Sequence, residues 1–215
     1  MKKITIITLF PLIASFILSG VAGASVIQYN QNGYQTPNGW VEIANLMQPN
    51  PDPGFSLNHD YYYLWGLNDL SYVPSQVNIV FHGIYDWTVE NDWINVYLKD
   101  NGSNLGITRF QDYQKLIIPN WAGLGYTNLG VWSDPTGGGA VRYDVVFTIE
   151  GSSLLNLLAN GNGFIIGIDP DCHYFGEKIT IEAPIPVPEP STLLLLGAGL
   201  VGFGIWGRRG IRRNK

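Results

Sequence analysis

The sequence predicts an all-β fold, a β-sandwich or jelly-roll-like domain with one short helix, over residues 25–183. Apolar and polar residues alternate along many short segments, which is typical of strands with one buried face. Gly, Asn and Pro residues separate these segments as turn signals. The residues between the two ends of the chain are also rich in Tyr, Trp and β-branched side chains, which favour strands.

The clearest strand pattern covers residues 140–150, where apolar residues occupy every second position from Val141 to Ile149. We expect further strands at residues 39–44, 61–65, 77–81, 94–98, 115–118, 164–168 and 178–182. Turns are predicted at residues 100–103 and 136–139, whose sequences are Asp-Asn-Gly-Ser and Thr-Gly-Gly-Gly.

One helix is predicted between two of these strands. Ser152 or Ser153 is a suitable N-cap for the Leu-rich residues 154–158, and Gly161 ends the helix. A helix this short should pack over one end of a sheet. Together with residues 145–148 and 163–167, the segment is similar to the end of carbohydrate-binding-type jelly rolls of bacterial surface proteins. This resemblance supports the fold and transfers no binding residue.

The N-terminus has the three parts of a secretory signal peptide over residues 1–24. Lys2 and Lys3 form a positive start, residues 4–18 are uncharged and apolar, and Ala22 and Ala24 supply the small side chains of a cleavage site. The alternative is a permanent N-terminal anchor, against which the small residues argue. The signal peptide implies the general secretion machinery and signal peptidase as partners.

The C-terminus contains a second apolar segment. Residues 184–190 form a Pro-rich spacer, residues 191–207 carry no charge, and residues 208–215 form a basic tail. We predict a transmembrane helix over residues 191–207, with Arg208, Arg209, Arg212 and Arg213 as its membrane stop. About 16 residues at 1.5 Å each reach about 24 Å, less than the ~30 Å hydrocarbon core, so the anchor is marginal.

Pro188, Glu189 and Pro190 form a Pro-Glu-Pro tripeptide, and the apolar segment and the arginines follow it. The order of these C-terminal parts resembles the PEP-CTERM sorting domain of bacterial exported proteins. The resemblance implies that an exosortase, a transpeptidase-like membrane enzyme, processes the chain at this tripeptide. It also implies an envelope rich in exopolysaccharide as the destination. The alternative is an ordinary tail anchor preceded by a chance Pro-Glu-Pro.

The charges are strongly segregated along the chain. All 17 acidic residues lie between Glu42 and Glu189, a region with only five basic residues, so its net charge is 5 − 17 = −12. Such a region is unsuited to nucleic acid or anionic lipid, because phosphate binding needs clustered cations. Lys and Arg at both ends favour the cytoplasmic side of the inner membrane. The domain should therefore lie outside the cytoplasm, and later at the cell surface or in the extracellular space.

Two acidic loops contain residues that could bind a metal ion, and calcium is the first ion to consider. These residues are Asp169 and Asp171 in one loop, and Asp86, Glu90 and Asp92 in the other. The first loop has no Gly at the position an EF-hand requires. Zinc is less expected, because the domain has only three His residues and one Cys. For both loops the favoured interpretation is ordinary turn and solvent-exposed carboxylates that bind no ion.

The lone cysteine, Cys172, allows no intrachain disulfide, so it is a buried thiol, an intermolecular bridge or a reactive group. We find no Gly-x-Ser-x-Gly, His-Glu-x-x-His or P-loop motif, so catalysis is not expected. Trp87 and Trp132 are candidates for stacking on glycans, although most tryptophans should fill the core. We therefore expect a non-catalytic surface or matrix protein that binds polysaccharide or a surface protein. The alternatives are a tethered carbohydrate-active enzyme and a purely structural matrix protein.

Overall fold

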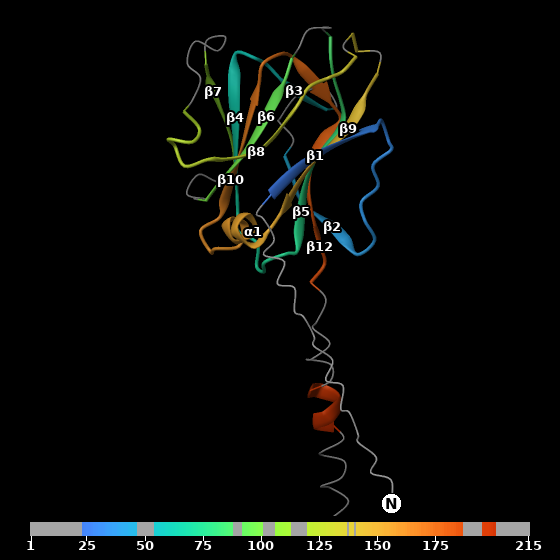
Figure 1. Ribbon diagram of the computed structural model, residues 1–215, viewed down its shortest axis with the longest axis vertical. Coiled ribbons are helices and arrows are strands. Elements are labelled where there is room, and N and C mark those ends of the chain that lie inside the picture. The colour runs from blue at the N-terminus through green and yellow to red at the C-terminus, as the bar shows by residue number, and fades with distance from the viewer. Residues whose placement is uncertain are drawn as a thin grey trace, which may run out of the picture.

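Two antiparallel β-sheets pack face to face in the computed structural model (Figure 1). The structure describes residues 23–46, 54–87, 92–100, 106–112, 120–136, 138–139, 141–186 and 195–200. Its elements are β1 (Gly23–Asn30), β2 (Trp40–Asn45), β3 (Phe55–Leu57), β4 (Tyr61–Leu67), β5 (Gln76–Asp86), β6 (Ile94–Asp100), β7 (Gly106–Gln111), β8 (Thr127–Trp132), β9 (Tyr143–Glu150), α1 (Ser152–Leu158), β10 (Phe164–Pro170), β11 (Tyr174–Gly176) and β12 (Lys178–Pro184). The predicted all-β class is confirmed.

The seven-stranded sheet is organised around the long strand β5. On one side β5 pairs with β9, which pairs with β1. On the other side the first half of β5 pairs with β12 and the last two residues pair with β11. The register of β5 shifts between Phe81 and Ile84, where Gly83 has a φ of 62° and donates its N–H to the Asp144 carboxylate. This bulge lets one strand serve two partners, since it re-aims the chain.

The five-stranded sheet has the order β7-β4-β10-β6-β8. Its central strand β10 runs antiparallel to both neighbours, with Gly167 opposite Leu64 on β4 and Tyr97 on β6. In this sheet β7 is exposed along its whole length and forms one edge.

The hydrophobic core lies between the two sheets. It contains the apolar residues at alternate positions of the predicted strands, such as Val77, Ile79 and Phe81 on β5 and Ile94, Val96 and Leu98 on β6. α1 adds its buried leucines to the same core, as its leucine-rich sequence predicts.

The outer face of the seven-stranded sheet is also covered in part. The Tyr34 hydroxyl donates to the Glu182 carboxylate at 2.6 Å and accepts a hydrogen bond from the Asn78 amide at 3.1 Å. The Thr148 hydroxyl donates to the same Asn78 side chain at 3.1 Å. A polar network under residues 31–39 therefore explains why both faces of β5 are buried, where the alternating pattern predicts only one.

Several sequence expectations are corrected by the structure. The residue at the N-cap of α1 is Gly151, with a φ of 86°, and neither Ser152 nor Ser153 caps the helix, because both lie inside it. Strands β1, β3, β7, β8 and β11 are additional to the predicted ones. The predicted strand at residues 115–118 lies outside the described residues.

The two predicted end segments are described only in part. β1 begins at Gly23 and pairs Ala24 with Ile149, so the predicted cleavage site overlaps the first strand. Of residues 191–207, the structure describes 195–200, which are helical. Within the described parts of the chain, no helix is long and apolar enough to cross a membrane.

His82 on β5 predicts a pH dependence of stability. Burial and the nearby Lys178 lower the pKa of His82 below its usual 6.5, although nearby carboxylates act in the opposite direction. The unfolded chain therefore takes up this proton at a higher pH than the folded protein. The contribution of neutral His82 to the free energy of unfolding is fully present above pH 6.5. It is lost as the pH falls from 6.5 through the lowered pKa.

We expect the free energy of unfolding, measured by urea titration between pH 7 and 5, to fall less steeply in His82→Gln than in the wild type. Glutamine keeps a polar group near the Thr180 hydroxyl, which lies 2.9 Å from the His82 Nε2. Equal slopes in the two proteins would contradict this assignment.

Candidate functional site

The outer face of the five-stranded sheet carries a group of five aromatic side chains, which we call the aromatic surface. They are Tyr62 on β4, Tyr97 on β6, Phe110 on β7, and Trp121 and Tyr126 in the segment that precedes β8. Side chains alternate between the two faces of a strand. Because the neighbours of Tyr62 and Tyr97 in the sequence include core residues, these two rings lie on the opposite, outer face.

Trp121 lies at the centre of the aromatic surface. Its ring stacks on Tyr97 with centroids 4.4 Å apart and an interplanar angle of 13°. Its Nε1 donates a buried hydrogen bond to the Asp169 carboxylate at 3.0 Å. A Cβ atom at Gly167 would lie 2.9 Å from Trp121 Cζ3, so the absence of a side chain there lets the indole lie close to the sheet.

The accessible part of the aromatic surface lies at the β7 edge. Phe110 is 40% exposed and stacks on Tyr62 with centroids 5.1 Å apart and an angle of 13°. Tyr62 and Trp121 then meet in an edge-to-face arrangement, with centroids 5.3 Å apart and an angle of 81°. The rings thus form a continuous set from the exposed edge to the buried indole.

Polar groups accompany these rings. Burial, with Asp112 and Asp169 nearby, raises the pKa of Tyr62, and burial raises the pKa of Tyr97. Both phenols are therefore neutral near pH 7. The side-chain amide of Asn128 lies beside Tyr97. Flat apolar rings and neutral hydrogen-bonding groups are thus combined on one surface.

The two tryptophans that the sequence suggests for stacking on glycans lie in different environments. Trp87 is 62% exposed, as expected, and packs against Tyr85. Trp132 is only 5% exposed, and its Nε1 donates to the Gln28 side chain at 2.7 Å. The expectation that Trp132 is exposed for stacking is wrong, because β8 turns this side chain into the core.

Asp169 and Asp171 have separate structural contacts. Asp169 accepts the hydrogen bond from Trp121. The Asp171 Oδ1 accepts one from the Trp93 backbone N–H at 3.0 Å, and the Asp171 N–H donates to the Trp93 carbonyl at 2.9 Å. Each carboxylate therefore holds a tryptophan-containing segment in place.

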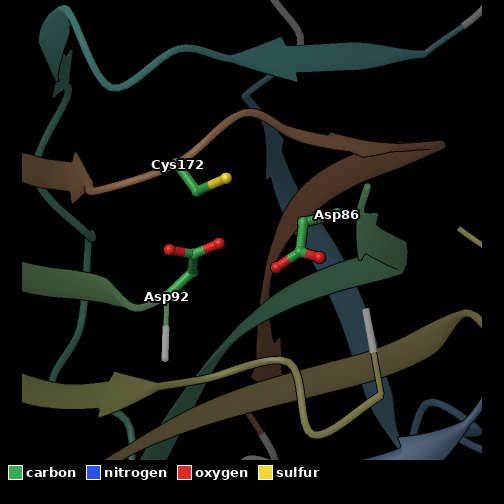
Figure 2. Close-up of side chains that lie close together, drawn as sticks. All are labelled: Asp86, Asp92 and Cys172. Carbon is green, nitrogen blue, oxygen red and sulfur yellow. The ribbon is translucent and has the colours of Figure 1, made fainter. Parts of the chain in front are cut away.

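The structure brings Asp86 and Asp92 together and adds Cys172 to them (Figure 2). Asp86 ends β5, Asp92 precedes β6, and Cys172 lies between β10 and β11. All three are buried, and one ligand atom from each lies within 4.8 Å of the others. Glu90, the remaining candidate from this loop, lies outside the described residues.

The residues predicted to act in sorting and targeting also lie largely outside the described part of the chain. These are Ala22 of the predicted cleavage site, Pro188, Glu189 and Pro190 of the tripeptide, and Arg208, Arg209, Arg212 and Arg213 of the basic tail. Comparison with known proteins concerns this C-terminal region. A family model described as the PEP-CTERM protein-sorting motif matches residues 186–213. No curated protein matches the chain.

Proposed function

We propose that this chain, which ends in a PEP-CTERM sorting motif, is an exported non-catalytic protein whose β-sandwich binds polysaccharide at the cell surface. The motif at residues 186–213 is consistent with an exosortase substrate and so implies export and sorting. Secretion through the general machinery, cleavage by signal peptidase and temporary anchoring in the inner membrane complete the proposed route. The envelope polymer is then the ligand that the delivered domain would meet.

The observation that carries the binding proposal is the aromatic surface. Sugar rings present flat, apolar C–H faces, and aromatic side chains stack on such faces while nearby amides and hydroxyls bind the sugar hydroxyls. Phe110 and Tyr62 supply two parallel stacked rings at an exposed edge. Asn128 and the neutral Tyr97 phenol lie further along the same surface and supply hydrogen-bonding groups.

A comparison of Phe110→Ala with Trp87→Ala tests where a polysaccharide binds. An aromatic contact contributes about 0.5–1.5 kcal/mol, so we expect Phe110→Ala to weaken binding by about 2- to 12-fold. Trp87→Ala removes an exposed ring that is not part of the aromatic surface, and we expect it to leave binding unchanged. The measurement is the dissociation constant for purified bacterial exopolysaccharide, after a glycan array has identified a bound sugar.

Three results would contradict the proposal. Loss of polysaccharide binding in Trp87→Ala but not in Phe110→Ala would place the binding site at Trp87, the stacking candidate predicted from the sequence. Absence of binding to any glycan would favour a structural matrix protein. Release of reducing sugar by the purified protein would favour a tethered carbohydrate-active enzyme.

A further inference from the structure

Three segments that are distant in the sequence deliver two carboxylates and one thiol to the same buried position. Figure 2 shows that the side chains of Asp86, Asp92 and Cys172 turn toward a common space. Two carboxylates at this separation repel each other when both are ionised, and a divalent cation between them makes the interaction favourable. The cluster is separate from the aromatic surface, to which none of the three residues belongs.

A fourth group points independently to a ligand. Tyr174 is directly opposite Asp86 in the pairing of β11 with β5, so both side chains project on the same face of the sheet. Tyr174 is 0% exposed, and its hydroxyl has no hydrogen-bond partner among the described residues. Its electrostatic neighbours include all three members of the cluster. A buried hydroxyl beside the cluster is suited to bind an ion or an ion-bound water.

Hydrogen bonds fix the backbone around the cluster. The reciprocal pair between Asp171 and Trp93 joins the residues that adjoin Cys172 and Asp92. The backbone N–H of Asp86 donates to the Asp134 carboxylate at 3.3 Å. The three ligand residues are therefore held by neighbouring groups, as metal ligands commonly are.

We propose that Asp86, Asp92 and Cys172 bind one divalent cation of intermediate softness, such as Zn²⁺, with the Tyr174 hydroxyl adjoining the fourth coordination position. Ligand atoms of a tetrahedral zinc site, at about 2.0–2.3 Å from the ion, lie about 3.5 Å apart. In the structure the ligand atoms of the three residues lie within 4.8 Å of one another, which is close to that separation. A thiolate does not suit Ca²⁺, which takes oxygen ligands, so this ion differs from the calcium that the sequence raised as a possibility. Cys172 binds as the thiolate, and binding therefore releases its proton to solvent.

The test uses the full chain, purified in detergent, stripped with a chelator and titrated with Zn²⁺, Co²⁺ or Ca²⁺. We expect one Zn²⁺ per chain, measured by elemental analysis after dialysis. We also expect a near-ultraviolet thiolate-to-metal absorption band with Co²⁺. Absence of stoichiometric Zn²⁺ would overturn the proposal, as would Ca²⁺ binding that does not depend on Cys172.

Variants identify the ligands. Cys172→Ser and Asp92→Asn should each weaken Zn²⁺ binding by more than about 100-fold. Loss of a residue that only hydrogen-bonds to a metal ligand typically weakens metal binding by ~10- to 100-fold, so the larger effect identifies a direct ligand. The matched control is Asp69→Asn, since Asp69 is an exposed carboxylate between β4 and β5. Equal Zn²⁺ affinity in the wild type and Cys172→Ser would overturn the proposal. Near-ultraviolet circular dichroism shows whether each ligand variant is folded. If one is unfolded, the proposal is tested by the Co²⁺ absorption band of the wild type and by the Tyr174→Phe variant.

Tyr174→Phe separates a metal site from an ordinary buried cluster. Removing an unpartnered hydroxyl from a site that binds nothing should leave the midpoint of thermal unfolding unchanged or raise it. In the proposed site the same change should weaken Zn²⁺ binding by about 10-fold. It should also reduce the rise in unfolding temperature that Zn²⁺ produces. An unchanged Zn²⁺ affinity would show that Tyr174 is not part of the site. It would overturn the proposal that its hydroxyl adjoins the fourth coordination position.

Discussion

Replacing Pro188, Glu189 and Pro190 together with alanine is expected to stop C-terminal processing and leave uncut precursor in the membrane fraction. The physical reason is that the tripeptide is a short recognition segment. Proline fixes φ near −65° and keeps the chain extended, and alanine removes that restraint. Glu189 is also the only carboxylate within residues 186–213 and stands ahead of four arginines. Loss of all three residues therefore removes both the shape and the charge of the motif.

Mass spectrometry of both ends of the protein measures this effect. The wild type should lack part of its C-terminal tail, whereas the triple variant should retain Lys215. The matched control is Ile185→Ala, because Ile185 is exposed and immediately precedes the matched segment. Normal release of the triple variant would contradict processing at the tripeptide.

The strands that could be predicted from the sequence are those with one face in the core. Residues 140–150 predict β9, and the alternations at residues 77–81 and 94–98 predict β5 and β6. The strands β3 and β11 have only three residues each, too few to show a period. β7 is exposed along its whole length, so its sequence has no buried face to reveal. β1 overlaps the predicted cleavage site, and there the small-residue pattern that predicts a targeting signal hides the strand.

The candidate sites depend on contacts between distant residues, which the sequence does not contain. Asp86 and Asp92 are close along the chain and could be paired from the sequence alone. Cys172 joins them only because the segment between β10 and β11 returns beside the end of β5. The Tyr61-Tyr62-Tyr63 run likewise shows three aromatics in a row. Only the strand register separates the core ring of Tyr63 from the surface ring of Tyr62.

Phe147→Ala is expected to have the largest effect on stability, because Phe147 fills the space between the two sheets. Its ring lies 5.5 Å from that of Phe81. A Cβ atom built at Gly130, on β8 of the other sheet, would lie 3.5 Å from Phe147 Cδ1. The ring therefore reaches across the sandwich, and the surrounding strands are held by their hydrogen-bond ladders and cannot close the cavity.

Truncation of such a ring costs about 3–5 kcal/mol, from a total of about 5–15 kcal/mol for a typical domain. Urea unfolding should therefore show a much lower midpoint with an unchanged slope. Phe110→Ala is the matched control, since it makes the same chemical change at a half-exposed edge residue, and we expect it to cost about 1 kcal/mol or less. Similar losses for the two variants would mean that the ring of Phe147 does not bridge the sheets. The contrast between them also matters for the binding test, because Phe110→Ala is informative about polysaccharide only if the sandwich remains folded.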